Sequence, residues 1–373
     1  MEYLPTMLKI IENGALANTE KVASYTKVLA DKLRDDGDTK AAQKVLNIIK
    51  QTNTRKGISP ASALNASTIP VDRDSRFSLA DESFPDIKDI DIQLDKIVEG
   101  PVEEFISFVE NAHLLSDAGV GISPSMLIYG PPGCGKSYLA QHIAARLKLP
   151  LLTTRCDSLM SSLLGSTAKN IRNLFDHAAN RPCVLFLDEF DALAKARDDQ
   201  HEVGELKRVV VGLLQNIDNL PSDTVVLAAT NHENLLDPAV WRRFAYRLNI
   251  QMPSYESREK LLKQYLKSFS PKNLKNLTSA TEGMSGALIQ QACEALIRLA
   301  ILSGDSNLDE NKLLVKIAQI QHYKIIQSHE TAESKIRQLK QTDSRLFTTR
   351  VLSELFTVST GKISKILNSP LQV

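Results

Sequence analysis

Residues 130–137 read Gly-Pro-Pro-Gly-Cys-Gly-Lys-Ser, so three glycines precede a lysine and a hydroxyl residue. The run follows the apolar residues 126–129 and precedes apolar residues at helical spacing, which predicts strand, loop and helix in that order. Glycines let backbone N–H groups point at phosphate oxygens, and a helix N-terminus adds partial positive charge. Lys136 would meet the β and γ phosphates, and Ser137 would offer a hydroxyl to Mg²⁺. The run predicts nucleotide binding; the alternative is a glycine-rich turn with a chance lysine.

Two further apolar segments end in polar residues. Residues 183–187 are followed by Asp188 and Glu189, and residues 224–230 are followed by Asn231. Ligands of parallel sheets bind at the carboxyl ends of the strands. We therefore expect Asp188 to orient the water shell of Mg²⁺, Glu189 to polarise the attacking water, and Asn231 to hold that water. The alternatives are an ordinary Asn turn for Asn231 and a nucleotide-gated scaffold without turnover, which the paired carboxylates disfavour.

Two adjacent arginines, Arg242 and Arg243, end a short predicted helix in residues 236–244. Neither has an evident partner within the sequence of one subunit. Their functional interpretation is an arginine finger that reaches the γ-phosphate of a neighbouring subunit. The alternative is a solvated basic helix end that the helix dipole favours.

The chain of 373 residues is long enough for about two domains. Strands alternate with helices from about residue 87 to 250, which predicts an α/β fold with a parallel sheet, and the periodicity beyond is helical. The predicted divisions are an N-terminal helical hairpin (1–50), a linker (51–85), the α/β nucleotide-binding domain (86–253), a helical lid (254–330) and C-terminal helices (331–373).

Composition excludes several classes of protein. Lys plus Arg number 45 against 44 Asp plus Glu, which gives a net charge of +1. This near-neutral charge excludes the strong overall positive potential of histone-like or heparin-binding proteins. The four cysteines form no CxxC pair or Cys/His cluster, so we expect buried thiols in a reducing compartment. No stretch approaches the roughly 20 apolar residues of a membrane span. We expect a cytoplasmic protein with no membrane partner.

From about residue 86 to 315 the chain resembles the AAA ATPases of the AAA+ P-loop class. The resemblance rests on six motifs in order, namely GPPGCGKS at 130, DEFDALAKARDD at 188, GELKRVVVGLLQNID at 204, AATN ending at 231, LDPAVWRRF ending at 244 and GMSGALIQQACEA at 283. It implies ATP and Mg²⁺ as ligands and a hexameric ring that commonly threads polypeptide through its pore. The ATP-binding residues that it implies are Gly130, Pro131, Pro132, Gly133, Cys134, Gly135, Lys136, Ser137, Tyr138, Asp188, Gly286 and Ala287. It further implies Ser137 and Asp188 as Mg²⁺ residues, Glu189 as the Walker B base, Asn231 as sensor 1, and Arg242 and Arg243 as arginine fingers.

The resemblance also shows one departure. In the family, a loop that grips the threaded chain reads aromatic, hydrophobic, Gly, Glu, whereas this chain has Leu163, Leu164 and Gly165, followed by Ser166. An aliphatic side chain offers apolar contact but lacks the flat ring that stacks on substrate. The departure argues against processive unfolding, and the alternative is that the leucines pack in the core.

Partners follow from the resemblance outside the ATPase module. The hairpin at 20–50 lies where katanin-like and spastin-like AAA proteins carry a helical adaptor domain, so we expect it to bind a partner or adaptor. The ATPase module most resembles small stand-alone bacterial AAA ATPases, some of which are encoded beside a subtilisin-like protease. Such a protease is therefore one expected partner.

Residues 352–368 resemble a helix-turn-helix with a turn at residues 357–359. Residues 331–373 carry seven basic and three acidic side chains, which permits phosphate contacts. Against DNA binding, Ser353 and Thr357 stand where such motifs prefer Ala and Gly. We therefore predict a ring-forming, Mg²⁺-dependent ATPase that remodels or unfolds a protein partner. The alternative is a DNA-directed AAA+ ATPase, a regulator or loader that uses these C-terminal helices; nucleic acid is the disfavoured partner.

Overall fold

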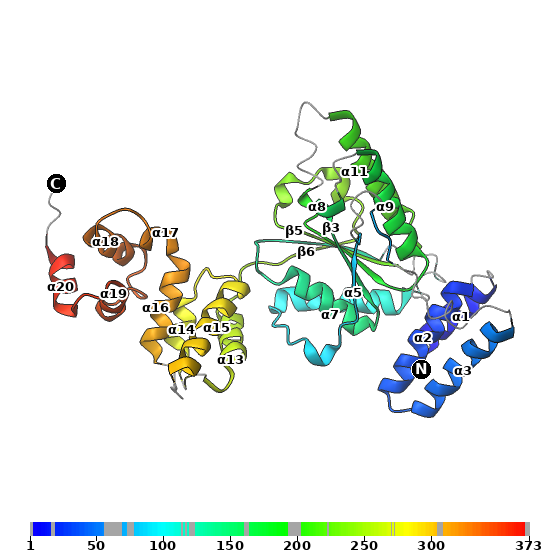
Figure 1. Ribbon diagram of the computed structural model, residues 1–373, viewed down its shortest axis with the longest axis horizontal. Helices are drawn as coiled ribbons and strands as arrows, with labels where there is room; N and C mark the ends of the chain where they lie inside the picture. Colours follow the sequence, from blue (N-terminus) through cyan, green and yellow to red (C-terminus); the bar gives the residue numbers. More distant parts are fainter. Residues whose placement is uncertain are drawn as a thin grey trace. The chain divides into compact units, whose positions relative to one another are not determined.

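The computed structural model describes residues 3–15, 19–55, 69–72, 78–112, 115, 118, 124–159, 164–192, 203–221, 224–269, 271, 273–303 and 309–369. The chain divides into two compact units, which are described separately (Figure 1). The first unit comprises Met1–Ile92, Lys96–Gly130 and Lys136–Ile250. The second comprises Gln93–Asp95, Pro131–Gly135 and Gln251–Val373.

A six-stranded sheet organises the first unit, with strand order β1-β3-β4-β5-β2-β6. The strands are β1 (Asp81–Ser83), β2 (Ser125–Tyr129), β3 (Leu151–Arg155), β4 (Val184–Asp188), β5 (Val225–Thr230) and β6 (Tyr246–Asn249). Five strands pair in parallel and β1 pairs antiparallel with β3. The central strands β4 and β5 are buried almost throughout, as expected for continuous apolar runs covered on both faces. The predicted α/β fold with a parallel sheet is confirmed.

Helices cover both faces of the sheet. Figure 1 shows α9 (Leu164–Ala179) and α11 (Val203–Asp218) on one side, with α5 (Lys96–Glu110) and α7 (Lys136–Leu147) on the other. The short helices α8 (Cys156–Leu159) and α12 (Pro238–Trp241) follow β3 and precede β6. The apolar face predicted for the helix after the glycine-rich loop is fully buried. This packing fixes the strand ends that carry the polar residues.

The N-terminal segment contains three helices: α1 (Leu4–Ala15), α2 (Thr19–Asp35) and α3 (Thr39–Arg55). Helices α2 and α3 form the predicted hairpin, and Gly37 in its turn has φ of 86°. Helix α1 was not predicted from the sequence. Helix α1 packs against α2, so the N-terminal element extends beyond a simple hairpin.

Strand β1 lies inside the segment predicted as a linker. It pairs with the outer edge of β3, with Glu82 opposite Leu152. Its anchor is an ion pair in which Glu82 Oε1 lies 2.7 Å from Arg181 Nη1, with the two side chains 12% and 14% exposed. Part of the segment that connects the N-terminal helices to the sheet is therefore a β-strand.

The second unit is helical. Its helices are α13 (Tyr255–Leu266), α14 (Lys275–Ala280), α15 (Gly286–Ser303), α16 (Glu310–Gln321), α17 (Tyr323–Ile326), α18 (Ala332–Thr342), α19 (Thr349–Phe356) and α20 (Thr360–Asn368). One apolar cluster runs from Leu262 to Ile366, so the predicted lid and the C-terminal helices share a core. None of the helices that the structure describes combines the length and the apolar composition needed to cross a membrane.

Thr357 ends α19 in the left-handed region, with φ of 56° and ψ of 41°. This conformation costs a β-branched residue about 1–2 kcal/mol, whereas glycine adopts it freely and loses about 0.5–1 kcal/mol through unfolded-state entropy. We expect Thr357→Gly to stabilise the helices on either side by up to about 1 kcal/mol. Slower hydrogen exchange of the α19 and α20 amides would show it. Ser364→Gly inside α20 is the matched control and should speed exchange; protection lost in both variants would contradict the prediction.

Candidate functional site

The glycine-rich loop begins at Gly130, directly after β2. Gly130 has φ of 139°, and a Cβ at this position would lie 1.9 Å from the backbone oxygen of Ile250. Ile250 is held there because its N–H donates to the Tyr129 carbonyl at 2.8 Å. Only glycine fits such a close approach between backbones. The end of β6 therefore fixes where the loop starts.

Lys136 is the first residue of α7 and is only 7% exposed. Its Nζ donates to the carbonyl oxygen of Gly130 at 2.7 Å, so the ammonium group lies within the loop that precedes its own helix. A buried ammonium group is costly unless hydrogen bonds or opposite charge compensate it. The loop therefore offers an anion a fixed positive charge beside a helix N-terminus.

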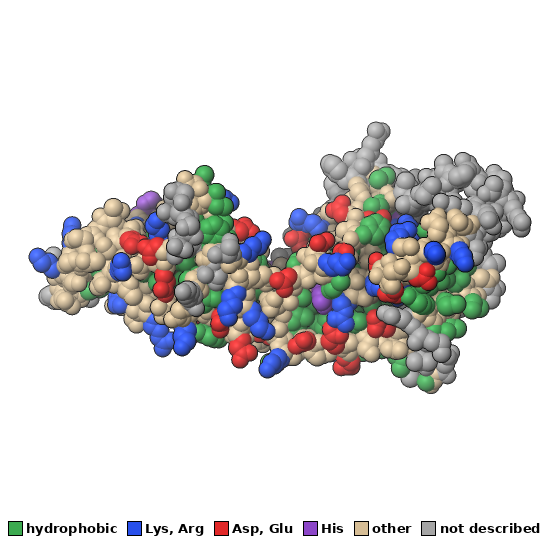
Figure 2. Space-filling view, turned by 90° about the horizontal axis from the view of Figure 1, so that it is seen from below, with side chains coloured by type: hydrophobic (Ala, Val, Ile, Leu, Met, Phe, Trp, Pro, Cys, Tyr) green, Lys and Arg blue, Asp and Glu red, His purple; other side chains and the backbone are tan. Residues whose placement is uncertain are grey.

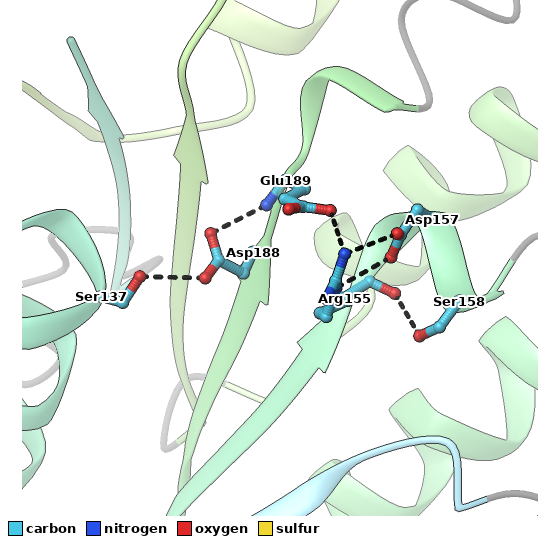
Figure 3. A network of polar contacts seen from close by, with 6 residues as sticks. All are labelled: Ser137, Arg155, Asp157, Ser158, Asp188 and Glu189. Carbon is cyan, nitrogen blue, oxygen red and sulfur yellow. Dashed lines mark hydrogen bonds and ion pairs between the residues drawn. The ribbon is translucent and has the colours of Figure 1, made fainter. Parts of the chain in front are cut away.

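Ser137, in the first turn of α7, and Asp188, at the end of β4, are brought together although β5 lies between β4 and β2, the strand that precedes α7. The Ser137 hydroxyl donates to Asp188 Oδ2 at 2.9 Å, and Asp188 Oδ1 accepts the backbone N–H of Glu189 at 2.9 Å (Figure 3). A hydroxyl and a carboxylate are hard oxygen donors, the ligand type that Mg²⁺ takes. The donor set present thus fits the predicted Mg²⁺ residues.

Glu189 follows β4 in the left-handed region, with φ of 54°. The next residue fixes this bend, because the Phe190 N–H donates to the Ala229 carbonyl of β5 at 2.8 Å. Strained backbone conformations of this kind cluster at functional sites. The bend directs the chain away from β4 while the Glu189 carboxylate stays 42% exposed at the strand end.

Arg155 was missed by the sequence interpretation. It ends β3 opposite Asp188 in the parallel register, and its Nη2 lies 3.0 Å from Glu189 Oε2 (Figure 3). Its Nε and Nη2 also donate to the Asp157 carboxylate at 3.2 and 2.8 Å. The hydrogen bonds to Asp157, and then those to Glu189, raise the pKa of Arg155. The sequence offered one signal for this residue. Arg155 stands at the carboxyl end of a strand, next to the strand that ends in Asp188.

Asn231 is half-buried directly after β5, the strand between β2 and β4. The neighbouring Thr230 hydroxyl donates to Asp191 Oδ1 at 3.0 Å, which ties the end of β5 to the turn after Glu189. Within the residues that the structure describes, no hydrogen bond joins the Asn231 side chain to Asp188 or Glu189. Asn231 therefore has the predicted strand position, and its contact with water stays a prediction.

The two arginines have different surroundings. Arg243 Nε donates to Asp218 Oδ2 of α11 at 2.9 Å, so Arg243 has a partner in its own chain that the sequence did not reveal. Arg242 caps the C-terminus of α12 and is exposed. Among the described residues, no carboxylate lies within ion-pair distance of Arg242. Of the two predicted fingers, Arg242 is the one available to another chain.

Residues 126–252 contain this loop, both carboxylates and both arginines, and they match the family described as ATPase family associated with various cellular activities (AAA). This part of the chain is an AAA ATPase domain. An uncharacterized AAA family ATPase of Sinorhizobium fredii is 41% identical over 58% of this chain and 64% of its own length. The 26S proteasome regulatory subunit 6A of Saccharomyces cerevisiae is 29% identical over 72% of the chain and 65% of its own length. The proteasome-activating nucleotidase of Saccharolobus solfataricus is 32% identical over 61% and 59%.

The chain thus spans slightly less than two thirds of the length of these relatives. The match confirms the predicted family, and it includes residues 130–137, which the sequence predicts to be the Walker A loop. The match also includes Asp188 and Glu189, the predicted Walker B pair. The roles of the individual residues within that family pattern remain predictions for this chain.

The remaining predicted ATP-binding residues include Tyr138, Gly286 and Ala287. The Tyr138 hydroxyl accepts the Asp91 N–H at 3.1 Å. Within the helical unit, the Ala287 N–H donates to the Gly133 carbonyl at 3.1 Å, and a Cβ on Gly133 would lie 2.7 Å from Ser285 Oγ. Gly286 begins α15 in the same segment. The segment at residues 285–287 therefore packs directly on the backbone of Gly133.

The prediction of buried thiols is correct for Cys156, Cys183 and Cys293 but wrong for Cys134, which is half-buried in the Walker A loop. Cys134 lies between Gly133 and Gly135, which both have positive φ, so it belongs to a turn and not to a packed helix or strand. Burial raises the pKa of the Cys293 thiol to about 12, so that thiol is inert.

Of the predicted pore loop, Leu163 lies outside the described residues. Leu164 and Gly165 are the first residues of α9. Their contact with a threaded substrate stays a prediction.

Proposed function

We propose that this protein hydrolyses ATP with Mg²⁺ and, as a ring of identical subunits, uses the energy to remodel a protein partner. The observation that carries the proposal is the convergence of Ser137, Asp188 and Glu189 at one edge of the sheet, beside the Walker A loop. A nucleotide-gated scaffold would not need an acidic group beyond the Mg²⁺ residues. The exposed Glu189 carboxylate favours hydrolysis.

The chemistry divides among the residues of this edge. Lys136 and the backbone N–H groups of residues 130–137 bind the β and γ phosphates, and Ser137 and Asp188 hold Mg²⁺. When bound, Mg²⁺ neutralises charge that develops on the phosphate oxygens. Glu189 accepts a proton from the water that attacks the γ-phosphorus, while the bond to the leaving ADP oxygen breaks. Arg155 holds the Glu189 carboxylate at the strand end before the reaction.

A ring is supported by the exposed Arg242 and by the relatives. An arginine that reaches a neighbour's site fits a head-to-tail assembly, and such an assembly forms a ring when its rotation closes. Two relatives are named as a proteasome regulatory subunit and a proteasome-activating nucleotidase, and these names support action on protein substrates. A hexamer is the assembly we propose. The N-terminal adaptor, the subtilisin-like protease and the cytoplasmic location stay predictions.

Nucleotide binding is tested by Lys136→Met, which keeps the apolar stem of the side chain and removes the ammonium group. Losing a buried, charge-assisted contact costs about 3–5 kcal/mol, so we expect ATP affinity to fall by roughly 10²–10⁴-fold. Titration calorimetry, and the rise in melting temperature that ATP causes, would measure this loss.

Lys148→Met is the matched control for Lys136→Met. Lys148 lies just beyond the other end of α7, outside the loop, so this variant removes the same charge and should keep its affinity for ATP. Unchanged ATP binding by Lys136→Met would refute the assignment of the Walker A loop as the nucleotide site.

A further inference from the structure

We propose that α19 and α20 form a helix-turn-helix that binds duplex DNA, with α20 as the helix that enters the major groove. The inference concerns a second binding surface and is independent of the proposed ATPase. Three observations carry it: the geometry of the turn, the packing of the two helices, and the side chains that α20 leaves exposed.

The turn between the two helices has the geometry that this motif needs. Residues 357–359 separate the helices, and Thr357 adopts the left-handed conformation that glycine usually supplies in such turns. The Val358 N–H donates to the Ser353 carbonyl at 3.0 Å. The Ser353 hydroxyl donates to the Val358 carbonyl at 2.6 Å, so its polar group is satisfied inside the turn.

These contacts answer the argument against DNA binding, which was that Ser353 and Thr357 stand where such motifs prefer Ala and Gly. Ser353 is small enough to fit beneath the turn, and its hydroxyl adds a hydrogen bond that Ala could not make. Thr357 reaches the required conformation at the cost of local strain. The two residues that argued against DNA binding therefore support the fold that the motif requires.

The packing holds the two helices on a rigid base. Helix α20 contacts both α18 and α19, while α19 contacts α16 of the lid (Figure 1). The anchoring side chains Val351, Leu352, Ile363 and Ile366 are buried at 7% exposure or less. Recognition helices act as fixed elements, and this one is supported by a helix on two sides.

The opposite face of α20 is polar and basic. Its exposed residues are Thr360, Gly361, Lys362, Lys365 and Asn368, and Ser364 between them is half-buried. The helix TGKISKILN contains no acidic residue. Lys and Asn side chains bind base edges in the major groove, and Ser and Thr bind either bases or phosphates.

Charge beside α20 extends the same surface. Arg345 and Arg350, before and at the start of α19, are exposed, and Glu354 is the exposed acidic residue on α19. In Figure 2 the end formed by the C-terminal helices is mainly tan, with scattered blue, red and green side chains and no large hydrophobic patch. A protein partner would need an apolar anchor at the centre of its interface, whereas a polyanion needs this excess of cations. The surface fits DNA better than protein.

The test uses the full-length chain and a labelled duplex of random sequence, about 30 base pairs long, in a fluorescence anisotropy titration. We expect saturable binding that weakens steeply between about 50 and 200 mM salt. Lys362→Ala/Lys365→Ala should lower the affinity at least about tenfold and reduce the log-log salt slope by about 2. Selection from a randomised duplex pool should enrich a common sequence with the unaltered chain.

The matched control is Lys275→Ala/Lys324→Ala, which removes two exposed lysines from other helices of the same unit. It should bind DNA within about twofold of the unaltered chain. ATP turnover and melting temperature are measured on the same samples, and both should be unchanged in the α20 variant. Because DNA binding and ATP turnover are measured on the same samples, failure of the DNA proposal can be distinguished from failure of the ATPase proposal.

Three outcomes would overturn the DNA proposal. The first is no saturable binding at about 50 mM salt, which would leave protein docking as the role of the surface. The second is an equal loss of affinity in the control variant, which would indicate diffuse attraction to charge. The third is single-stranded RNA that binds as tightly as the duplex.

Discussion

Glu189→Gln is expected to lower ATP turnover by roughly 10²–10⁴-fold while ATP affinity stays within a few-fold of that of the unaltered protein. The amide has the size of the carboxylate but cannot accept the proton of the attacking water. Glu189 makes no part of the Walker A loop, and its backbone N–H contact with Asp188 Oδ1 does not depend on the side chain. Single-turnover hydrolysis and equilibrium ATP binding, measured separately, would show the separation.

Asp157→Asn is the matched control for Glu189→Gln. Asp157 and Glu189 are both acceptors for Arg155, so both changes weaken the same network of contacts (Figure 3). Asp157 is not assigned to the reaction, and its variant should keep turnover within about tenfold. Equal losses in the two variants would show that the network, and not a base at Glu189, limits the rate.

Arg242→Ala is expected to lower turnover by about 10³-fold or more, the scale of arginine fingers supplied in trans. The structure places Arg242 on the surface, while Arg243 is paired with Asp218 of its own subunit. Arg243→Ala should accordingly act on stability more than on the rate. The measurements are ATP turnover of each variant and its oligomeric state by light scattering.

Mixing two inactive variants tests whether the arginine acts between subunits. An Arg242→Ala subunit keeps an intact Walker A loop, and a Lys136→Met subunit keeps Arg242. In an equal mixture, about a quarter of the boundaries would join one of each in the productive order, so about a quarter of the activity should return. No recovery in mixed rings, or a fully active monomer, would contradict the proposal.

The sequence predicted the parts of the fold whose signals are local. Strands β2, β4 and β5 are continuous apolar runs, and the glycines of the Walker A loop mark the start of α7, so each prediction needed only neighbouring residues. The positions of Asp188, Glu189 and Asn231, each at or just after the end of an apolar strand, could likewise be predicted from neighbouring residues. Their common edge of the sheet could be expected because parallel strands end together.

Other features depended on contacts between distant segments. Strand β1 reads Asp-Glu-Ser, a composition with low strand propensity, and it is extended because β3 offers hydrogen bonds and Arg181 offers a counter-charge. Arg155 could join the site only through the register of β3 on β4. The pairing of Arg243 with Asp218 likewise needed the packing of α11. Such contacts carry no periodic signal in the sequence.

Strand β1 also bears on how this protein avoids aggregation. The match to the AAA family begins at residue 126, so a shortened chain that starts there would lack β1 and leave the edge of β3 with unpaired backbone groups. Exposed edges of this kind act as templates on which other chains add strands. Three residues with two carboxylates close that edge and are too short and too charged to extend the sheet. We therefore expect a chain cut back to the family match to aggregate more readily than one that keeps β1.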